Sequence, residues 1–211
     1  MNLSQLRTAF LHAADDPYQD KYKNEIVHRL LNVAKDQILK VIDQSDENYL
    51  SSFHDWVVNA QNADQEETLP TDFRKVLLVE RLVTGERPIP LEPIDFANRD
   101  LPTTSRAVDH YYLRGDKIGI IAPKESYTAR LWYSIQIPDM ESDDDKPTGI
   151  PNEHHYLLAL HALKLSYATE ERNWLGSAWA DEYERQMTSL RNTVKARQRQ
   201  RPRYVNQPYA S

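Results

Sequence analysis

Apolar residues recur at helical spacing near the beginning of the chain. Within residues 3–14 they fall on one side of a helix, at Leu3, Leu6, Phe10 and Leu11. Residues 21–43 repeat the pattern over a longer stretch. Its apolar stripe consists of Ile26, Leu30, Leu31, Ala34, Ile38, Leu39 and Ile42. These two patterns predict a short amphipathic helix followed by a long helix with one buried face.

After Asp43 the chain becomes rich in residues that favour strands. Strands are expected around residues 53–58 and 73–83, and 87–91 would return as an edge strand because it contains two prolines. The clearest hairpin pairs residues 108–113 with 117–122 across Arg114-Gly115-Asp116, and residues 127–137 follow as a third consecutive strand. Together these segments predict an antiparallel sheet of about four to six strands.

Helical spacing returns after residue 151. A helix is expected from Asn152, which can cap it, to near Thr169, and the last helix carries Leu175, Trp179, Tyr183, Met187, Leu190 and Val194 at near-heptad spacing. The short connection favours an antiparallel helix pair. Beyond Gln200 two prolines and a low apolar content predict an extended arm that is disordered alone.

This order of elements predicts an α+β fold with N-terminal helices, a central antiparallel β-sheet, and a C-terminal antiparallel helix pair with an extended basic tail. The expected segments are N-terminal helices in 1–45, the sheet region in 46–138, and an exposed acidic linker in 139–151. A helical hairpin in 152–199 and a C-terminal arm in 200–211 follow. We expect one compact domain plus the arm.

Composition narrows the function classes. The 211 residues include no cysteine, which excludes disulfides, cysteine-ligated metals and cysteine nucleophiles. Only five residues are glycine, and none of the glycine-rich phosphate-binding motifs is present. No apolar run approaches the ~20 residues of a membrane helix, and the N-terminus lacks the apolar core of a signal peptide. We therefore expect a protein that does not enter a membrane and is made in the cytoplasm.

Candidate sites for chemistry are weak. His154, His155 and His161 lack the one-turn spacing of a helical zinc site, and they are expected on a partly exposed helix face. The acidic run 143–145 lacks the alternating ligands of a calcium loop and is expected to be solvated. No Ser, His and Asp combine in a recognisable catalytic context. We therefore expect no enzymatic activity, no metal and no cofactor.

The distribution of charge is the one sharp signal. Between Glu184 and Arg203 the chain carries a net charge of +6, which leaves −12 for the remainder of a chain whose total is −6. Six of the seven basic residues of this segment are arginine, whose guanidinium group binds carboxylate or phosphate in two places. This asymmetry predicts an interaction tail. A solvated helix end, favoured by the helix dipole, and an arm that binds nucleic acid remain as alternatives.

The chain resembles head-to-tail adaptor (connector) proteins of tailed bacteriophages of the podophage type. The resemblance consists of several short motifs that follow one another in the same order as in that family. Leu69-Pro70-Thr71-Asp72-Phe73 looks like the family's entry into its sheet, and residues 111–118 look like its hairpin. The strand 129–134, the acidic segment, and Ile150-Pro151-Asn152-Glu153 opening a helix follow the family's order. Residues 180–185 match its closing helix. The resemblance covers about residues 1–200, while the arginine-rich tail and the proline-rich 87–93 segment depart from it.

The resemblance implies a structural virion protein of the neck or tail, assembled in the host cytoplasm. It implies a homo-oligomeric ring of twelve copies between the portal protein and the tail or nozzle proteins, with DNA passing through the channel. The C-terminal arm would dock on the portal. The residues expected to do so are Arg197, Arg199, Arg201, Arg203, Tyr204 and Tyr209. The alternative function is a regulatory protein that binds nucleic acid through the same arm.

Overall fold

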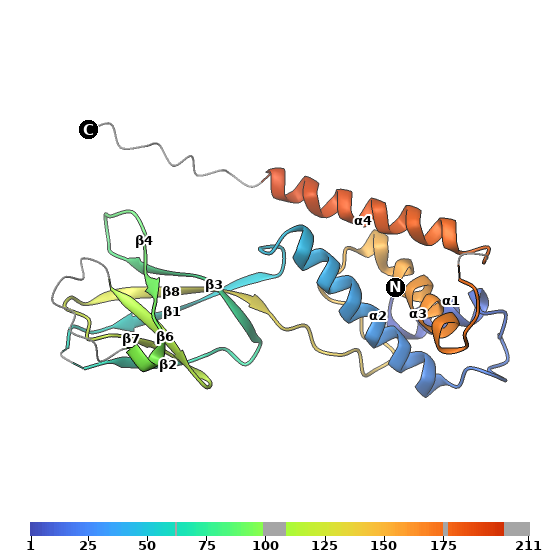
Figure 1. Cartoon of the computed structure of the whole chain (residues 1–211), viewed down its shortest axis with the longest axis horizontal. Coiled ribbons are helices and arrows are strands. Elements are labelled where there is room, and N and C mark those ends of the chain that lie inside the picture. Colours follow the sequence, from blue (N-terminus) through green and yellow to red (C-terminus); the bar gives the residue numbers. More distant parts are fainter. Residues whose placement is uncertain (62, 99–108, 175–176, 201–211) are drawn as a thin grey trace. The chain divides into compact units, whose positions relative to one another are not determined.

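The computed structural model divides into two compact units (Figure 1). The helical unit comprises Met1–Tyr49 and Ile137–Ser211, and the sheet unit comprises Leu50–Gln136. The structure describes residues 1–61, 63–98, 109–174 and 177–200. The predicted α+β class is confirmed, although residues at both ends of the chain build the same helical unit.

In its described part, the helical unit contains four α-helices: α1 (Leu3–Ala13), α2 (Asn24–Ser45), α3 (His155–Thr169) and α4 (Ala180–Gln200). The two predicted N-terminal helices are confirmed, and α1 begins with a capping box in which the side chains of Asn2 and Gln5 bind each other's backbone amides. A 3-10 turn, η2 (Asn152–His154), precedes α3.

Helix α3 is the centre of this unit and contacts α1, α2 and α4. It buries residues around most of its circumference, including Leu157, Leu158, Leu160 and Leu163. A helix that is apolar on all sides is stable only when other elements surround it, which is the position α3 occupies. The predicted pair of C-terminal helices is therefore part of a four-helix arrangement. Among the described residues no helix has the length and apolar character needed to cross a bilayer.

The segment 139–151, predicted as an exposed acidic linker, belongs to the helical unit. Met140 is buried, and its backbone N–H and C=O both pair with the Asn32 side chain of α2 at 3.0 Å. Lys35 of α2, whose side chain is 0% exposed, donates to the carbonyl of Pro138 and to Asp139 Oδ1, both at 2.7 Å. Most residues of this segment are exposed, but Met140, Pro147 and Ile150 are buried, and the hydrogen bonds to α2 attach the segment to the helices.

The described residues of the sheet unit, which exclude 62 and 99–108, form eight strands. They are β1 (Ser51–Val58), β2 (Gln65–Thr68), β3 (Phe73–Leu82), β4 (Ile89–Pro90), β5 (Glu92–Pro93), β6 (His110–Arg114), β7 (Lys117–Ile120) and β8 (Tyr127–Ile135). A short 3-10 helix, η1 (Phe96–Asn98), follows β5.

The strands make two four-stranded sheets instead of the single sheet predicted. One has the order β1-β8-β3-β4 and is antiparallel, and the other has the order β2-β7-β6-β5, in which β5 and β6 are parallel. The predicted β6–β7 hairpin and the edge position of residues 89–90 are confirmed. The strand β8, expected beside that hairpin, instead pairs with β1 and β3.

One apolar core connects the two sheets. It contains Trp56, Val79 and Leu131 from the first sheet and Ile118 and Ile120 from the second. These side chains leave their strands at every second position, so that each sheet presents one face to the core.

A close contact in the hairpin leaves no room for a side chain at Gly119. Tyr112 and Gly119 are directly opposite in the β6–β7 pair, and the Tyr112 ring, 2% exposed, covers the glycine. A Cβ atom at position 119 would lie 2.2 Å from Cζ of Tyr112. Replacing Gly119 by alanine is therefore expected to destabilise the sheet unit by about 1–3 kcal/mol, measured by urea unfolding.

The neighbouring Gly115 is the control for this substitution. It has a φ of +60°, and a Cβ there would meet no atom within 4 Å, so Gly115→Asn is expected to cost less. If the clash with the Tyr112 ring causes the loss of stability, Gly119→Ala should be nearly neutral in a Tyr112→Ala background. An equal loss of stability in both backgrounds would contradict the clash as the cause.

Candidate functional site

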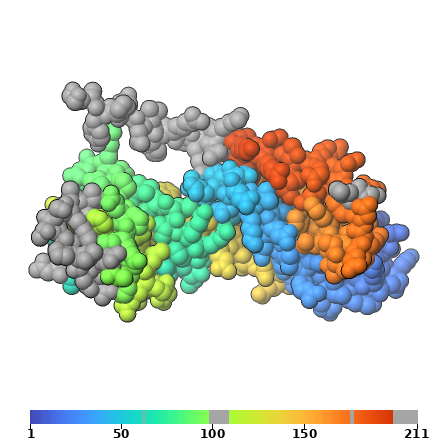
Figure 2. All heavy atoms as spheres, in the orientation of Figure 1, coloured from blue at the N-terminus to red at the C-terminus, as the bar shows by residue number. Residues whose placement is uncertain are grey.

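Helix α4 carries the basic segment that the sequence singles out. Its buried side is a seam of Ala180, Tyr183, Met187, Leu190 and Val194, spaced by three or four residues, which packs on α2 and α3. Its outer side faces solvent (Figure 2), and every described basic side chain of α4 is exposed. These residues are Arg185, Arg191, Lys195 and Arg197.

Charge is distributed unevenly along α4. Asp181 and Glu182 lie in its first turn, whereas beyond Glu184 the described charged residues are all basic. Acids near the N-terminus and cations near the C-terminus of a helix both interact favourably with its dipole. The sequence thus stabilises the helix and concentrates positive charge toward its C-terminal end.

Both ends of the last helical segment are anchored. The Trp179 indole, just before α4, donates to the carbonyl of Ala13 at 3.0 Å. Near the other end, Arg197 Nη1 donates to the hydroxyl of Tyr49 at 2.7 Å, and its guanidinium carbon lies 5.3 Å from the centre of the Tyr49 ring. Burial, the largest effect, raises the pKa of Tyr49. The hydroxyl therefore stays protonated, and the direction in which α4 ends is held within the helical unit.

Of the residues predicted to bind a partner, only Arg197 has a described side chain. Arg199 lies in the last turn of α4, and its side chain is outside the described residues. Arg201, Arg203, Tyr204 and Tyr209 also lie outside them. The contact between Arg197 and Tyr49 was not predicted, because residues 148 positions apart carry no shared local pattern.

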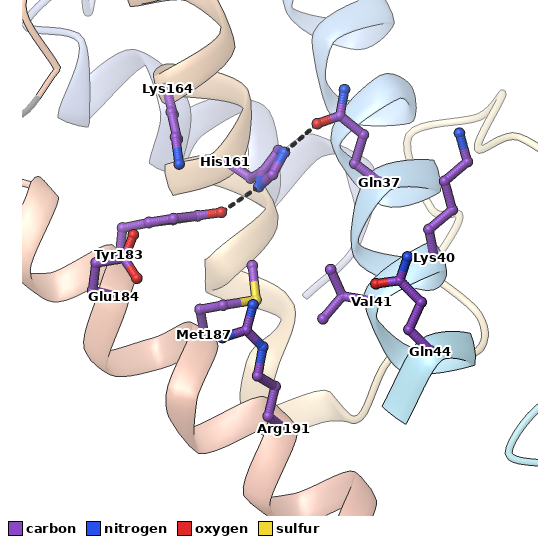
Figure 3. Close-up of a pocket in the computed structure, with 10 residues that line it drawn as sticks. All are labelled: Gln37, Lys40, Val41, Gln44, His161, Lys164, Tyr183, Glu184, Met187 and Arg191. Carbon is purple, nitrogen blue, oxygen red and sulfur yellow. Dashed lines mark hydrogen bonds between the residues drawn. The ribbon is translucent and has the colours of Figure 1, made fainter. Parts of the chain in front are cut away.

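A groove lies between α2, α3 and α4 in the helical unit (Figure 3). Its volume is about 320 Å³. The lining residues come from all three helices: Gln37, Lys40, Val41, Gln44, His161, Lys164, Tyr183, Glu184, Met187 and Arg191. Three of them are cations and one is an acid, so the groove is positively charged.

His161 organises the inner wall of this groove. Its Nε2 lies 2.8 Å from Oε1 of Gln37 and its Nδ1 lies 2.9 Å from the Tyr183 hydroxyl (Figure 3). Burial and then the charge of Lys164 lower the pKa of His161 to about 4, and burial raises the pKa of Tyr183 to about 12. The imidazole is therefore neutral near pH 7, donating from Nε2 to Gln37 and accepting the Tyr183 proton at Nδ1.

The other two histidines are also structural. His154 contacts the hydroxyl of Thr193 on α4 at 3.1 Å, and His155 Nε2 lies 3.0 Å from the carbonyl of Ile150. Burial lowers the pKa of both. The prediction that these three histidines lie on a partly exposed helix face is wrong, because His154, His155 and His161 are at most 7% exposed. His155 and His161 lie on α3, which α1, α2 and α4 contact, and His154 lies in η2 directly before it.

The sheet unit has a second notable surface, on the outer face of β1 and β8. Arg130 makes two hydrogen bonds of 2.7 Å to the carboxylate of Asp55, and its guanidinium lies 4.5 Å from the centre of the Phe53 ring. Phe53 and Val57 remain 52% and 67% exposed. Arg130 and Asp55 neutralise each other on this face, beside these two exposed apolar side chains.

Within the described ranges, no group of three or more His, Asp or Glu side chains is arranged to hold a metal ion. The notable surface features of the described residues are a basic helix, a positively charged groove and a partly apolar sheet face.

Comparison with known proteins agrees with this description. No curated protein matches the chain. The sequence profile of the SU10 adaptor protein family matches residues 1–208, which is nearly the whole chain. The predicted resemblance to bacteriophage adaptor proteins is therefore confirmed, and the chain belongs to the SU10 adaptor protein family.

Proposed function

We propose that this protein is a head-to-tail adaptor that forms a ring between the portal and the tail of a bacteriophage virion, and that it docks on the portal through its C-terminal arm. Membership of a bacteriophage adaptor family makes it a structural phage protein. The ring of twelve, the portal as partner, the tail or nozzle proteins on the other side and the non-enzymatic role are our proposals.

The exposed basic residues at the end of α4 support the proposed role of the arm. The helix presents Arg191, Lys195 and Arg197 to solvent and continues directly into residues 201–211, which contain Arg201 and Arg203. Because Arg197 is held by Tyr49, every copy of the chain would start its arm from the same place. Arginine suits carboxylate groups on a protein partner, because its two parallel N–H groups bind both carboxylate oxygens.

The presence of many arms in one ring would supply the affinity for the portal. An arm that becomes ordered on binding loses conformational entropy, so a single arm binds weakly for the area that it covers. In a ring, each bound arm raises the effective concentration of the next, and the total affinity exceeds that of one arm by orders of magnitude. The excess negative charge outside the basic segment would also limit adhesion to DNA in the channel.

Removal of residues 201–211 tests the proposal. The cut follows Gln200, because a shorter chain would also lose the Arg197–Tyr49 contact and confuse docking with stability. We expect the truncated protein to keep its helical circular dichroism and to lose binding to the cognate portal, measured by co-sedimentation and by electron microscopy of the mixture. The matched control is Arg185→Ala, an exposed basic residue of α4 far from the arm, which should bind normally.

The alternative use of the same arm predicts a different result. An arm that binds nucleic acid would give filter retention of DNA that falls steeply with salt and is lost on the same truncation. Portal binding that survives the truncation would contradict the proposed role of the arm, and salt-sensitive DNA retention in its place would favour the alternative.

A further inference from the structure

The groove between α2, α3 and α4 contains more positive than negative side chains. Lys40 of α2 and Arg191 of α4 are exposed and form no ion pair with any residue that the structure describes. Lys164 of α3 lies over the Tyr183 ring, with 4.4 Å between its Nζ and the ring centre. Val41 and Met187 add an apolar part to the lining (Figure 3). Such a groove suits a carboxylate-bearing segment with some apolar surface.

The same unit presents a carboxylate-bearing segment on another side of α2. The acidic loop, residues 141–145, belongs to the segment that Asn32 and Lys35 hold against α2, whereas the groove uses Gln37, Lys40, Val41 and Gln44 of that helix. One turn of a helix takes 3.6 residues, so these two sets of residues lie on different sides of α2. The loop and the groove of one copy therefore face different directions.

The acidic loop is held in one conformation. Asp145 accepts hydrogen bonds from the amides of Glu141 and Ser142 at 2.7 and 2.9 Å, and from the Ser142 hydroxyl at 2.7 Å. This arrangement leaves the carboxylates of Glu141 and Asp144 exposed, and neither forms an ion pair within the described part of the chain. A rigid loop loses little conformational entropy when it binds, which favours association.

We propose that the positively charged groove of one copy receives the acidic loop of a second copy, with Lys40 and Arg191 facing Glu141 and Asp144. This inference rests on the ring in the proposed function and names the surfaces that build it. The two surfaces are different, so the contact is head-to-tail, and repetition of such a contact generates a closed ring or a filament. Single exposed ion pairs contribute little, but several pairs partly enclosed by a groove form a network, repeated at every interface.

Charge reversal on each side separately tests this contact. The groove variant Lys40→Glu/Arg191→Glu and the loop variant Glu141→Lys/Asp144→Lys change only exposed side chains, so both should fold with unchanged circular dichroism. In sedimentation velocity, wild-type self-association should weaken with added salt. Each variant alone should associate at least tenfold more weakly than wild type. Mixed at equal concentrations, the two variants should recover assembly, because each interface again joins opposite charges.

A matched control reverses two exposed cations of the helical unit outside the groove. Lys23→Glu/Arg185→Glu changes the net charge as much as the groove variant and should associate like wild type. Three results would overturn the inference. The groove variant could assemble normally, the mixture of the groove and loop variants could fail to associate, or the wild-type protein could remain monomeric. A groove variant that keeps self-association but loses portal binding would show that the portal occupies the groove.

The test is separable from that of the proposed docking. The protein truncated after Gln200 retains the groove and the loop, so it should still self-associate while failing to bind the portal. Failure of the arm proposal therefore leaves the self-association result unaffected, and the reverse also holds.

Discussion

Replacing Leu131 by alanine is expected to destabilise the sheet unit by about 2–5 kcal/mol. Leu131 is 0% exposed and belongs to the core between the two sheets. It lies on β8, between His54 of β1 and Val79 of β3, so strands on both sides limit how far the structure can collapse around a cavity. The loss should appear as a lower urea midpoint, followed by tryptophan fluorescence, to which Trp56 and Trp132 of the sheet unit contribute.

Leu113 is the control for this prediction. It carries the same side chain on β6 of the same unit but is 43% exposed. Leu113→Ala should therefore cost well below 2 kcal/mol, since little apolar surface returns to water. Equal losses at the two positions would mean that the core between the sheets is not where we describe it.

Acidification is expected to destabilise the helical unit through His161. The pKa of His161 is about 4 in the folded protein, below the 6.5 of the free side chain, because burial and Lys164 disfavour the charged form. Between these values the unfolded chain binds more protons than the folded one, so stability falls as pH falls through this window. The full effect is about 3 kcal/mol, of which about 2 kcal/mol is lost between pH 7 and pH 5. His154 and His155, whose pKa values burial also lowers, act in the same direction.

Urea unfolding followed by far-ultraviolet circular dichroism at pH 7 and pH 5 measures this effect. His161→Gln can keep a donor and an acceptor between Gln37 and Tyr183 but does not titrate, so its acid sensitivity should be smaller than that of wild type. His12→Gln, which removes an exposed histidine from α1, should retain the wild-type sensitivity. An unchanged pH dependence in His161→Gln would show that the buried imidazole does not cause the acid sensitivity.

Helices and turns were predictable because their signals are local. The apolar stripes of α1 and α2, the turn at Gly115 and the edge strand at Ile89–Pro90 each depend on residues within a few positions of one another. Strand partners are different, since β8 lies between β1 and β3 through pairings of distant segments. β2 was missed because Gln65–Thr68 has little apolar content, and it is identified only by its pairing with β7.

In the candidate site, too, some features could be predicted from the sequence and others depend on the packing of distant segments. The excess of arginine near the C-terminus is visible in the sequence, and so is the resemblance to adaptor proteins, which is carried by the order of short motifs. The groove is not visible, because Lys40, Lys164 and Arg191 come from three helices and acquire a common direction only when those helices pack. Nor does local pattern separate a buried polar side chain from an exposed one. The burial of Lys35 and His161 depends on partners more than 100 positions away along the chain.

The sequence by itself therefore determined the class of fold, the position of the helices, the β6–β7 hairpin, the charge of the last helix and the family. Hydrophobic periodicity and charge are properties of neighbouring residues, so they can be read along the chain. The tertiary structure alone decided the two sheets, the binding of the acidic segment to α2, the neutral histidines around α3 and the groove beside α4. Each of these depends on packing and hydrogen bonds between distant segments, and folding brings those segments together only when the apolar surfaces of the whole chain are buried.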